Sequence, residues 1–416
     1  MNLQTSYDMT IVGAGTVGMA CAIALAQRGL RVLLLEHKPA PVQADFDRRL
    51  AHRDARVYAL NRASIELFES IGVWQMLSRQ ADYTRMQVWA RDGCGELNFG
   101  DGKMMLGSMV EPSVIDYALW CRGQMQDLAD YLTVCYEARL CADGMAIDEI
   151  ADGVVLRFHH GGQQRCVRTS LLLGADGRGS MVRQTVGIGI ETLDYHQTAI
   201  CCAIHTDKAH TQTARQVMLP TGTLALLPIA DLHDDDNGRW QSVVWTLPQA
   251  VAQDYLADYR HEPDSLRLRL EQASGFELGR ILAVESVASF ALSAQVASRY
   301  HQGRIGLIGD AAHGVHPLAG QGLNLGLLDV IKLLECLDAH KNRYDNTLHP
   351  RLLHDYERAA KGHNALMMHS FSLINFAFAS GIADLNGFSH LRSEVMNAIG
   401  KNRTIMQFFE RRASGQ

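Results

Sequence analysis

Residues 8–29 read DMTIVGAGTVGMACAIALAQRG, which is the pattern of a strand, a glycine turn and a helix. Residues 8–12 are short and apolar, as in a buried strand, and residues 17–27 have the apolar spacing of a helix. Gly29 stands where a helix C-terminus favours glycine. A second apolar run over residues 31–35 predicts the next buried strand. We therefore expect the chain to open with a strand–turn–helix–strand unit.

The turn carries three glycines, Gly13, Gly15 and Gly18, with the spacing G-x-G-x-x-G. In such a motif the first glycine permits the tight turn, and the second lets the backbone approach a diphosphate. The third lets the helix pack closely on the strand. The free N–H groups at the helix N-terminus attract phosphate, and Glu36 has the spacing of a carboxylate that binds ribose hydroxyls. The pattern predicts a dinucleotide site without distinguishing NAD from FAD.

A second glycine-rich segment decides between the two nucleotides. Gly309-Asp310 follows an apolar strand over residues 304–308, and the segment PLAGQGLN, residues 317–324, leads into a predicted helix. A carboxylate at a strand end can hold the hydroxyls of a ribityl chain. The N–H groups at the start of the following helix can face the negatively charged edge of a flavin. NAD has no ribityl chain, so this segment favours FAD.

The composition is that of a soluble globular enzyme. The chain has 416 residues, of which 47% are hydrophobic and 20% charged, enough for two intertwined domains or one large α/β domain with an inserted sheet. The formal net charge of -6 argues against nucleic acid as a partner, because phosphate binding favours a basic surface. The nine cysteines form no Cys-x-x-Cys pair, so we expect a reduced, cytoplasmic protein.

Two segments raise the question of a membrane. Residues 9–26 have the hydropathy of a signal peptide or a short membrane span, but three glycines interrupt them and no basic segment precedes them, so we interpret them as buried protein. The tail combines an apolar run, Phe371–Ile382, with several basic residues between Ser389 and Gln416. A solvated helical face is the default interpretation of this tail. Peripheral contact with the inner membrane face is a second hypothesis.

The strands that build the nucleotide-binding sheet are far apart, near residues 10, 35, 170 and 306. Between them, residues 192–251 alternate short β-rich runs with turns, which predicts an antiparallel sheet. The predicted fold is α/β: a Rossmann-like FAD-binding domain with an interleaved antiparallel-sheet substrate domain and a C-terminal helical region. The expected boundaries are 1–75, 113–190 and 301–345 for the FAD-binding parts, 76–112 and 191–300 for the substrate sheet, and 346–416 for the helical region.

Metal binding is not expected. Asp234–Asp236 precede Asn237-Gly238, a turn sequence, and a solvated hairpin tip is preferred there over a cation site. His313 and His316 are close in sequence, but Pro317 follows and no carboxylate accompanies them in the pattern of a metal site.

Three motifs together resemble the group A flavin monooxygenases of the p-hydroxybenzoate hydroxylase fold. They are Gly13–Gly18, Asp176-Gly177 with Ser180 and Arg183, and Gly309-Asp310. Further segments narrow the resemblance to the ubiquinone-biosynthesis ring hydroxylases, of the 2-octaprenylphenol hydroxylase type. These segments are Arg56-Val57-x-Ala59-Leu60, Ile71–Trp74, Ala118–Trp120 and His316–Asn324.

The resemblance implies roles for several residues. Asp310 would contact the ribityl chain of FAD, residues 320–324 would face the pyrimidine edge of the flavin, and Arg56 would lie near the cofactor. Asp176-Gly177 would lie by the pyrophosphate and by the route of NADPH or NADH. The complete predicted cofactor-binding set is Gly13, Gly15, Gly18, Glu36, Arg56, Asp176, Gly177, Asp310, Pro317, Gly320, Gly322, Leu323 and Asn324. This chain departs from the relatives at Val110-Glu111-Pro112, where they carry Val-Glu-Asn, so no side-chain contact is expected from the third position.

The activity that the resemblance implies is hydroxylation of a polyprenyl phenol. NADPH or NADH would reduce the flavin, O2 would add to give the C4a-hydroperoxide, and its distal oxygen would attack the electron-rich ring. We expect Leu224, Leu226 and Pro228, on the predicted strand 223–229, to line the substrate pocket, since an apolar lining suits a prenylated substrate. No catalytic residue is assigned. Packing is preferred over a general-base role for His313, because this reaction needs little help from a base.

Other functions are alternatives to this one. One is a different reaction on the same flavin fold, namely halogenation, epoxidation or prenyl reduction, although a halogenase would carry Trp-x-Trp, which this chain lacks. A group A hydroxylase of another phenol is a further alternative. The hypothesis of an NAD-dependent dehydrogenase does not explain the pattern of residues 309–324. A non-catalytic subunit that binds other ubiquinone-biosynthesis proteins is the alternative from a different class.

Overall fold

The first strand of the chain lies at the centre of a parallel sheet. In the computed structural model, β1 (Ser6–Val12) pairs in parallel with β2 (Val32–Leu35) on one side and β12 (Gln163–Gly174) on the other. β8 (Leu132–Cys135) extends the parallel order beyond β2, and β19 (Ile305–Leu307) extends it beyond β12. The strands predicted near residues 10, 35, 170 and 306 are therefore neighbours, which confirms the interleaved α/β fold. The structure describes residues 4–91, 96–141, 146–314, 322–343 and 348–361.

An antiparallel extension widens this sheet. β11 (Gly153–His160) forms the predicted hairpin with β12, and Gly161 and Gly162 at its tip both have positive φ. Within the described residues the sheet has nine strands, in the order β10-β11-β12-β1-β2-β8, with β9, β18 and β19 beside this path. The remaining strands of this sheet are β9 (Arg139–Leu140), β10 (Ile147–Ile150) and β18 (His301–Gln302).

Helix α1 (Thr16–Ala26) is buried along almost its whole length. It packs against α4 (Pro112–Gly123) and α8 (Gly322–Lys341), and its residues from Gly18 to Ala26 are all buried. Among the described residues, no helix is long and apolar enough to cross a membrane. The other helices of this lobe are α2 (Gln43–Leu50), α3 (Arg62–Ser70), α5 (Met181–Thr185) and the single 3-10 turns η1 (Trp74–Met76), η2 (Gln126–Leu128) and η3 (Gly309–Ala311).

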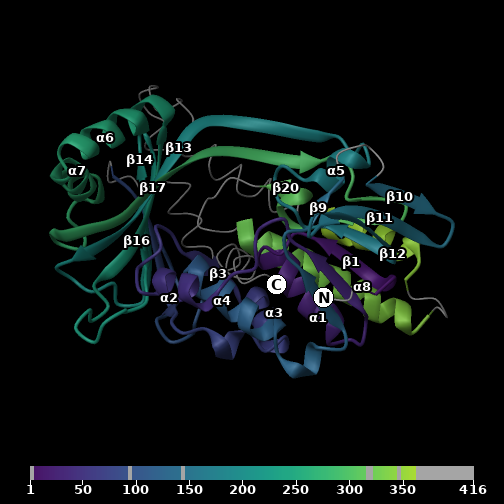
Figure 1. Cartoon of the computed structure of the whole chain (residues 1–416). Helices are drawn as coiled ribbons and strands as arrows, with labels where there is room; N and C mark the ends of the chain where they lie inside the picture. The colour runs from purple at the N-terminus through teal and green to yellow at the C-terminus, as the bar shows by residue number, and fades with distance from the viewer. Residues whose placement is uncertain (1–3, 92–95, 142–145, 315–321, 344–347, 362–416) are drawn as a thin grey trace.

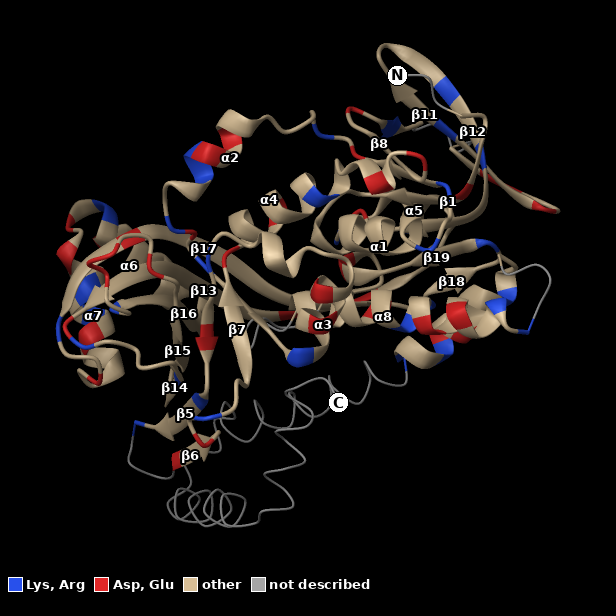
Figure 2. Ribbon diagram, turned by 90° about the horizontal axis from the view of Figure 1, so that it is seen from below, with Lys and Arg blue, Asp and Glu red and all other residues tan. Residues whose placement is uncertain are grey.

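The second lobe is built on an eight-stranded sheet, in the order β20-β17-β13-β16-β15-β14-β5-β6 over the described part of the chain. Its neighbours are antiparallel except for β14 and β5, which run parallel. One face is covered by α6 (Gln249–His261) and α7 (Asp264–Ser274), and acidic and basic residues are interspersed along these helices and α8 (Figure 2). The strands are β5 (Arg85–Ala90), β6 (Glu96–Phe99), β13 (Ile190–Thr206), β14 (Thr213–Leu219), β15 (Gly222–Pro228), β16 (Trp240–Pro248), β17 (Ile281–Ala297) and β20 (His313–Gly314).

Two long strands connect the lobes. β13 and β17 each have 17 residues, and Figure 1 shows both passing from the second lobe to the first above the middle of the molecule. The sequence predicted only residues 198–205 of β13. The earlier half of the strand is largely exposed, so it lacks the apolar alternation by which a strand is detected. A register shift between Asp194 and Gln197, where His196 has a φ of 54°, separates the two halves.

A small three-stranded sheet lies between the lobes. Its order is β3-β7-β4, formed by β3 (Tyr58–Leu60), β7 (Gly107–Val110) and β4 (Ala81–Tyr83). Ala59 and Met109 on this sheet share an apolar core with Ala225 and Leu227 of β15. The first lobe is thereby packed onto the face of the eight-stranded sheet opposite to α6 and α7.

The predicted C-terminal helical region lies mostly outside the described residues. Residues 350–361 are helical, and Tyr356 among them donates a hydrogen bond to the carbonyl of Leu307 at 2.9 Å, which attaches this helix to β19. The segment predicted to contact a membrane, residues 389–416, lies outside the described residues.

Candidate flavin and substrate site

The glycine turn has the geometry that its spacing predicts. Gly13 has a φ of 104°, and a β-carbon there would overlap the carbonyl of Ala175, while a β-carbon at Gly18 would overlap the Gly13 carbonyl. At Gly15, by contrast, no described atom lies within 4 Å of where a β-carbon would stand. Helix α1 begins there with no side-chain cap and no acidic residue in its first turn. The open space and the exposed helix N-terminus suit a diphosphate.

Glu36 lies directly beside this turn. One carboxylate oxygen accepts a hydrogen bond from the N–H of Ala14 at 2.8 Å, and the other accepts from the N–H of Lys38 at 2.9 Å. These contacts fix the carboxylate at the end of β2. The oxygen that binds Lys38 also lies 2.9 Å from Nδ1 of His37, while the oxygen that binds Ala14 keeps a lone pair for a further donor, as ribose binding at this place would require.

The second glycine motif meets the first. Gly309 has a φ of 59°, and a β-carbon there would stand 3.3 Å from Val17 at the start of α1. Gly326 on α8 faces the same valine. Asp329, also on α8, accepts hydrogen bonds at a single oxygen from the N–H of Gly309 at 2.8 Å and from Nε2 of His313 at 2.6 Å. The two turns, nearly three hundred residues apart, therefore form one structure.

His313 is buried where the two glycine turns meet. Burial opposes its protonation, but the charge of Asp329, the hydrogen bond to it and the charge of Asp310 together raise the pKa of His313 above its usual range. The ring also packs on Tyr300, with centroids 5.6 Å apart. This buried placement agrees with the packing role.

Asp310 lies at the exposed edge of the contact between the two glycine turns. Its side chain is exposed, yet desolvation by the surrounding protein raises the pKa of the carboxyl against the opposing charges of His313, Arg178 and Arg56. Its backbone carbonyl accepts a hydrogen bond from Gln295 of β17 at 2.9 Å. Asp310 is thus held by its backbone while the carboxylate remains available to a ligand.

The carboxylate of Asp176 has a local structural role. Its carboxylate accepts hydrogen bonds from the Ser180 hydroxyl at 2.5 Å and from the N–H of Val182 at 3.1 Å, which caps the start of α5. Gly177 has a φ of 78° and open space around it. Arg183 is buried, and its guanidinium donates to the carbonyl of Ala311 at 2.9 Å. The Asp176-Gly177 motif is therefore tied to the Gly309-Asp310 motif through Arg183.

Asn324 also acts as a connector. Its amide nitrogen donates to the carbonyl of Ala59 at 2.7 Å, and its oxygen accepts from the N–H of Asn61 and the hydroxyl of Ser64. The side chain thus joins α8 to β3 and α3. Gly322 and Leu323 form the first residues of α8, while the predicted site residues Pro317 and Gly320 lie outside the described residues.

The structure corrects two of the predicted pocket residues. Leu224 and Leu226 are buried with Trp245 and Leu266 in the core beneath α6 and α7, on the face directed away from the first lobe. Side chains alternate along a strand, so Ala225 and Leu227 take the inward face instead. Alternation was visible in the sequence, but nothing in it showed which face the helices would cover. Pro228 follows at the buried end of the strand.

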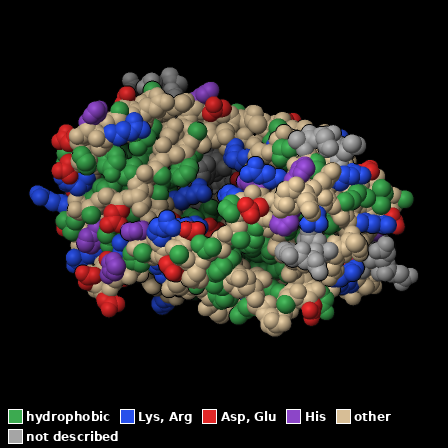
Figure 3. Space-filling view, in the orientation of Figure 1, with side chains coloured by type: hydrophobic (Ala, Val, Ile, Leu, Met, Phe, Trp, Pro, Cys, Tyr) green, Lys and Arg blue, Asp and Glu red, His purple; other side chains and the backbone are tan. Residues whose placement is uncertain are grey.

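A small apolar cluster lies on the inward face of β13 and β17, and Gln295 of β17 also binds the backbone carbonyl of Asp310. Ala199, Cys201 and Leu292 form the buried part of this cluster. The space-filling view shows the molecule hollowed between the lobes, with basic side chains at the hollow (Figure 3). Arg56 reaches across from the first lobe: its guanidinium lies 5.2 Å from the ring of Tyr58 and 5.0 Å from the ring of Phe290 on β17.

A buried ion pair that the sequence did not reveal joins the lobes elsewhere. Arg53 and Asp236 are both almost fully buried and form a salt bridge, with the Arg53 guanidinium 3.8 Å from the ring centre of Trp240. Asp236 also accepts hydrogen bonds from the backbone N–H groups of Leu232 and His233. The expectation of a solvated tip is therefore wrong for Asp236. Among the described residues, no group of acidic, cysteine and histidine side chains could hold a metal ion.

The Val110-Glu111-Pro112 departure is accommodated structurally. Glu111 is buried, and its carboxylate pairs with Arg79 at 2.5 Å and accepts from the N–H of Asp54 at 2.8 Å. Pro112 is the first residue of α4, a position that tolerates proline, and Asp54 accepts from the N–H of Ser113 at 2.7 Å. The helix is capped without an asparagine at the third position.

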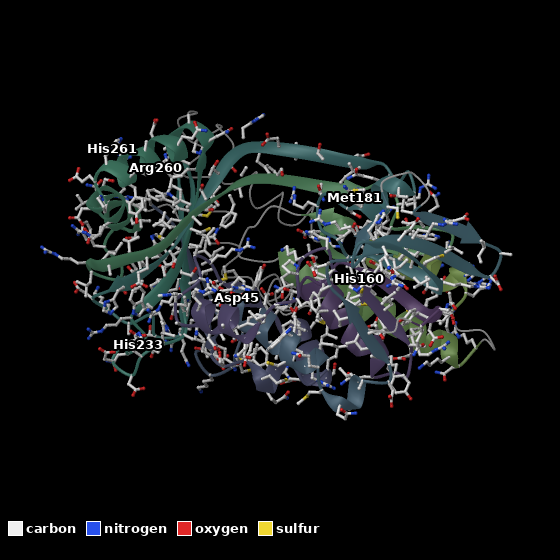
Figure 4. All side chains as sticks on the ribbon, in the orientation of Figure 1. Asp45, His160, Met181, His233, Arg260 and His261 are labelled. Atoms are coloured by element: carbon white, nitrogen blue, oxygen red, sulfur yellow. The ribbon has the colours of Figure 1, made fainter. Side chains whose placement is uncertain are left out.

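Figure 4 places these elements relative to the rest of the molecule. Met181, the first residue of α5, lies below the connecting strands, and Asp45 of α2 lies near the middle of the molecule. His233, Arg260 and His261 mark the far side of the second lobe. The contacts of Arg56 with Phe290 and of Asp310 with Gln295 place the candidate site between the first lobe and β17.

Comparison with known proteins adds a family context. The model of the family described as FAD binding domain matches residues 6–370. The chain is 32% identical over 413 residues to the ubiquinone hydroxylase UbiL of Rhodospirillum rubrum, covering 98% of this chain and 89% of that protein. It is 30% identical over 397 residues to 3-demethoxyubiquinol 3-hydroxylase of Escherichia coli, covering 92% and 93%. The crystal structure of p-nitrophenol 4-monooxygenase PnpA from Pseudomonas putida matches with a TM-score of 0.73 at 15% identity, covering 98% of this chain and 97% of that one, which shows a shared fold.

Proposed function

Because the chain belongs to the FAD-binding-domain family of FAD-dependent monooxygenases, we propose that it hydroxylates the aromatic ring of a polyprenyl phenol in ubiquinone biosynthesis. The reaction consumes one NADPH or NADH and one O2. One oxygen atom enters the ring and the other leaves as water, while the nicotinamide is oxidised.

One observation carries this proposal: the joining of the two glycine turns beside an apolar face. Gly15 offers open space for a diphosphate, Asp310 presents a carboxylate, and Val17 packs against Gly309 between them. The buried surface of Ala199, Cys201 and Leu292 lies on the strands facing this joint. A nucleotide with a ribityl chain fits the first part, and an apolar phenol fits the second.

The bound flavin would supply hydride acceptance and oxygen activation. The residues of the chain would hold the flavin and orient the substrate ring. The N–H groups at the start of α1 would bind the diphosphate, Glu36 the ribose, and Asp310 the ribityl hydroxyls. Arg56 would lie against the cofactor from the side of β3. The inward face of the second lobe would exclude water from the reacting ring.

The test is incorporation of isotope-labelled O2 into a polyprenyl phenol by the purified FAD-loaded protein with NADPH or NADH. We expect one labelled oxygen atom in the ring of the product. Oxidation of NADPH or NADH with no labelled product from any prenylated phenol would contradict the substrate class and favour another phenol. Absence of FAD-dependent NADPH or NADH oxidation, together with binding to other ubiquinone-biosynthesis proteins, would favour the non-catalytic subunit.

A further inference from the structure

Phe290 differs from its neighbours on the inward face of the second lobe. It pairs with Ala199 across β13 and β17, and paired residues point to the same side of a sheet. Leu292, two residues further on, is buried on that side. Phe290 itself is 39% exposed, so part of a large apolar ring remains uncovered on this face.

The position of Phe290 is fixed by the first lobe. The Arg56 guanidinium lies 5.0 Å from its ring centre, within the range of a cation–π contact, and Arg56 is also among the charges that act on Asp310. Arg56 is itself held by a 3.1 Å hydrogen bond to the hydroxyl of Tyr58. The ring is therefore held next to the predicted flavin-binding residues rather than in open solvent.

Several side chains near Phe290 on this face are small, and Tyr195 packs against the same cluster. The cross-strand partner of Phe290 is Ala199, the next inward pair is Cys201 with Ala288, and Ala55 packs on the same cluster. An aromatic ring beside small side chains can take a second ring in an offset or edge-on contact. An aliphatic ligand would gain only the apolar contact.

We propose that Phe290 is a positioning residue for the substrate, and that its ring orients the phenol ring of the substrate toward the flavin. The inference rests on the proposed function, because it assigns the substrate class to the same site. It predicts that affinity and productive hydroxylation depend on an aromatic side chain at position 290, and not only on an apolar one.

The experiment compares Phe290→Leu and Phe290→Tyr in the FAD-loaded protein. Titration with ortho-prenylphenol, followed through the absorption of the oxidised flavin, measures binding without turnover. For Phe290→Leu we expect about a tenfold weaker Kd and a lower yield of hydroxylated product per NADPH or NADH oxidised. Phe290→Tyr should restore both. FAD affinity and Tm should stay at wild-type values in each variant, since the side chain is partly exposed.

Phe276→Leu is the matched control, because Phe276 is 49% exposed and follows α7 on the other side of the sheet. It should bind ortho-prenylphenol like the wild type. Wild-type affinity and product yield in Phe290→Leu would overturn the inference. A wild-type protein that binds the phenol but never hydroxylates it would refute the proposed function instead, while the binding comparison would still decide the role of Phe290.

Discussion

Gly326 on α8 lies so close to Val17 on α1 that a β-carbon at position 326 would stand 2.7 Å from Cγ2 of the valine. The same position would lie 3.3 Å from the Cα of Gly309. This contact joins the helix that begins at the first glycine turn to the helix that follows the second. The proposed cofactor site depends on it, because it sets the distance between Gly15 and Asp310.

Gly326→Ala should therefore separate the two turns. The added methyl group has to displace Val17 or the backbone of Gly309, and we expect a loss of about 1–3 kcal/mol in the free energy of unfolding. Val17→Ala removes Cγ2, the atom that the new methyl group would overlap. The double variant should therefore regain part of the lost free energy of unfolding. Denaturant unfolding of the four proteins measures the coupling. Additive losses would show that the two side chains do not meet.

Gly15→Val tests the space beside the first turn. Gly15 has an extended backbone with a φ of −68°, which valine adopts readily, and the space around a β-carbon is open. The variant should fold with a Tm near that of the wild type while its Kd for FAD rises at least about tenfold, or ~1.4 kcal/mol. Gly189→Ala, where a β-carbon makes ordinary contact with Ser298, is the control. Stoichiometric flavin in purified Gly15→Val would contradict the assignment.

The Asp329–His313 pair predicts a pH dependence of stability. The folded state raises the pKa of His313, so the stabilisation from its protonated form is present in full below the unfolded value of about 6.5 and is lost as pH rises through the higher folded value. The stability difference between the wild type and His313→Gln should shrink accordingly as pH increases. Unfolding free energies measured from pH values below to above neutrality give this difference. A constant difference would argue against a charged His313.

Asp236→Leu should destabilise the protein strongly, because it removes the buried partner of Arg53 and leaves only the longer, 3.7 Å contact with the half-exposed Glu285; we expect about 3–5 kcal/mol. Arg53→Met combined with Asp236→Leu should lose less than the single change, since no buried charge remains. The exposed pair Lys332–Glu335 is the control, and Glu335→Ala should cost about 0–1 kcal/mol. A small effect of Asp236→Leu would mean that water reaches Arg53.

The parts of the fold that follow local rules could be predicted from the sequence. The glycine spacing, the all-apolar strands and the hairpin at Gly161-Gly162 each depend on neighbouring residues, and the structure confirms them. Strand β8 was not predicted, because its four residues carry no turn signal of their own. The exposed half of β13 was missed for the lack of alternation.

The site was less predictable where contacts between residues far apart in the sequence determine which side chains line it. Which face of β15 lines the pocket depends on where α6 and α7 pack, and Leu224 and Leu226 were therefore assigned to the wrong side. Asp236 lies in a turn sequence that usually meets water, but it is buried in contact with Trp240 and with Arg53, which is 183 residues away. The cofactor roles of Glu36, Arg56 and Asp310 stay predictions.

The most direct test of a single cofactor bound by both turns compares FAD with ADP, which lacks the ribityl chain and the flavin. Equilibrium titration of the apoprotein with each nucleotide gives the two dissociation constants for wild type, Gly15→Val and Asp310→Ala. Gly15→Val should weaken both ligands, whereas Asp310→Ala should weaken FAD about tenfold and leave ADP unchanged. If Asp310→Ala leaves FAD binding unchanged, or weakens ADP as much as FAD, the two turns do not hold the two ends of one flavin.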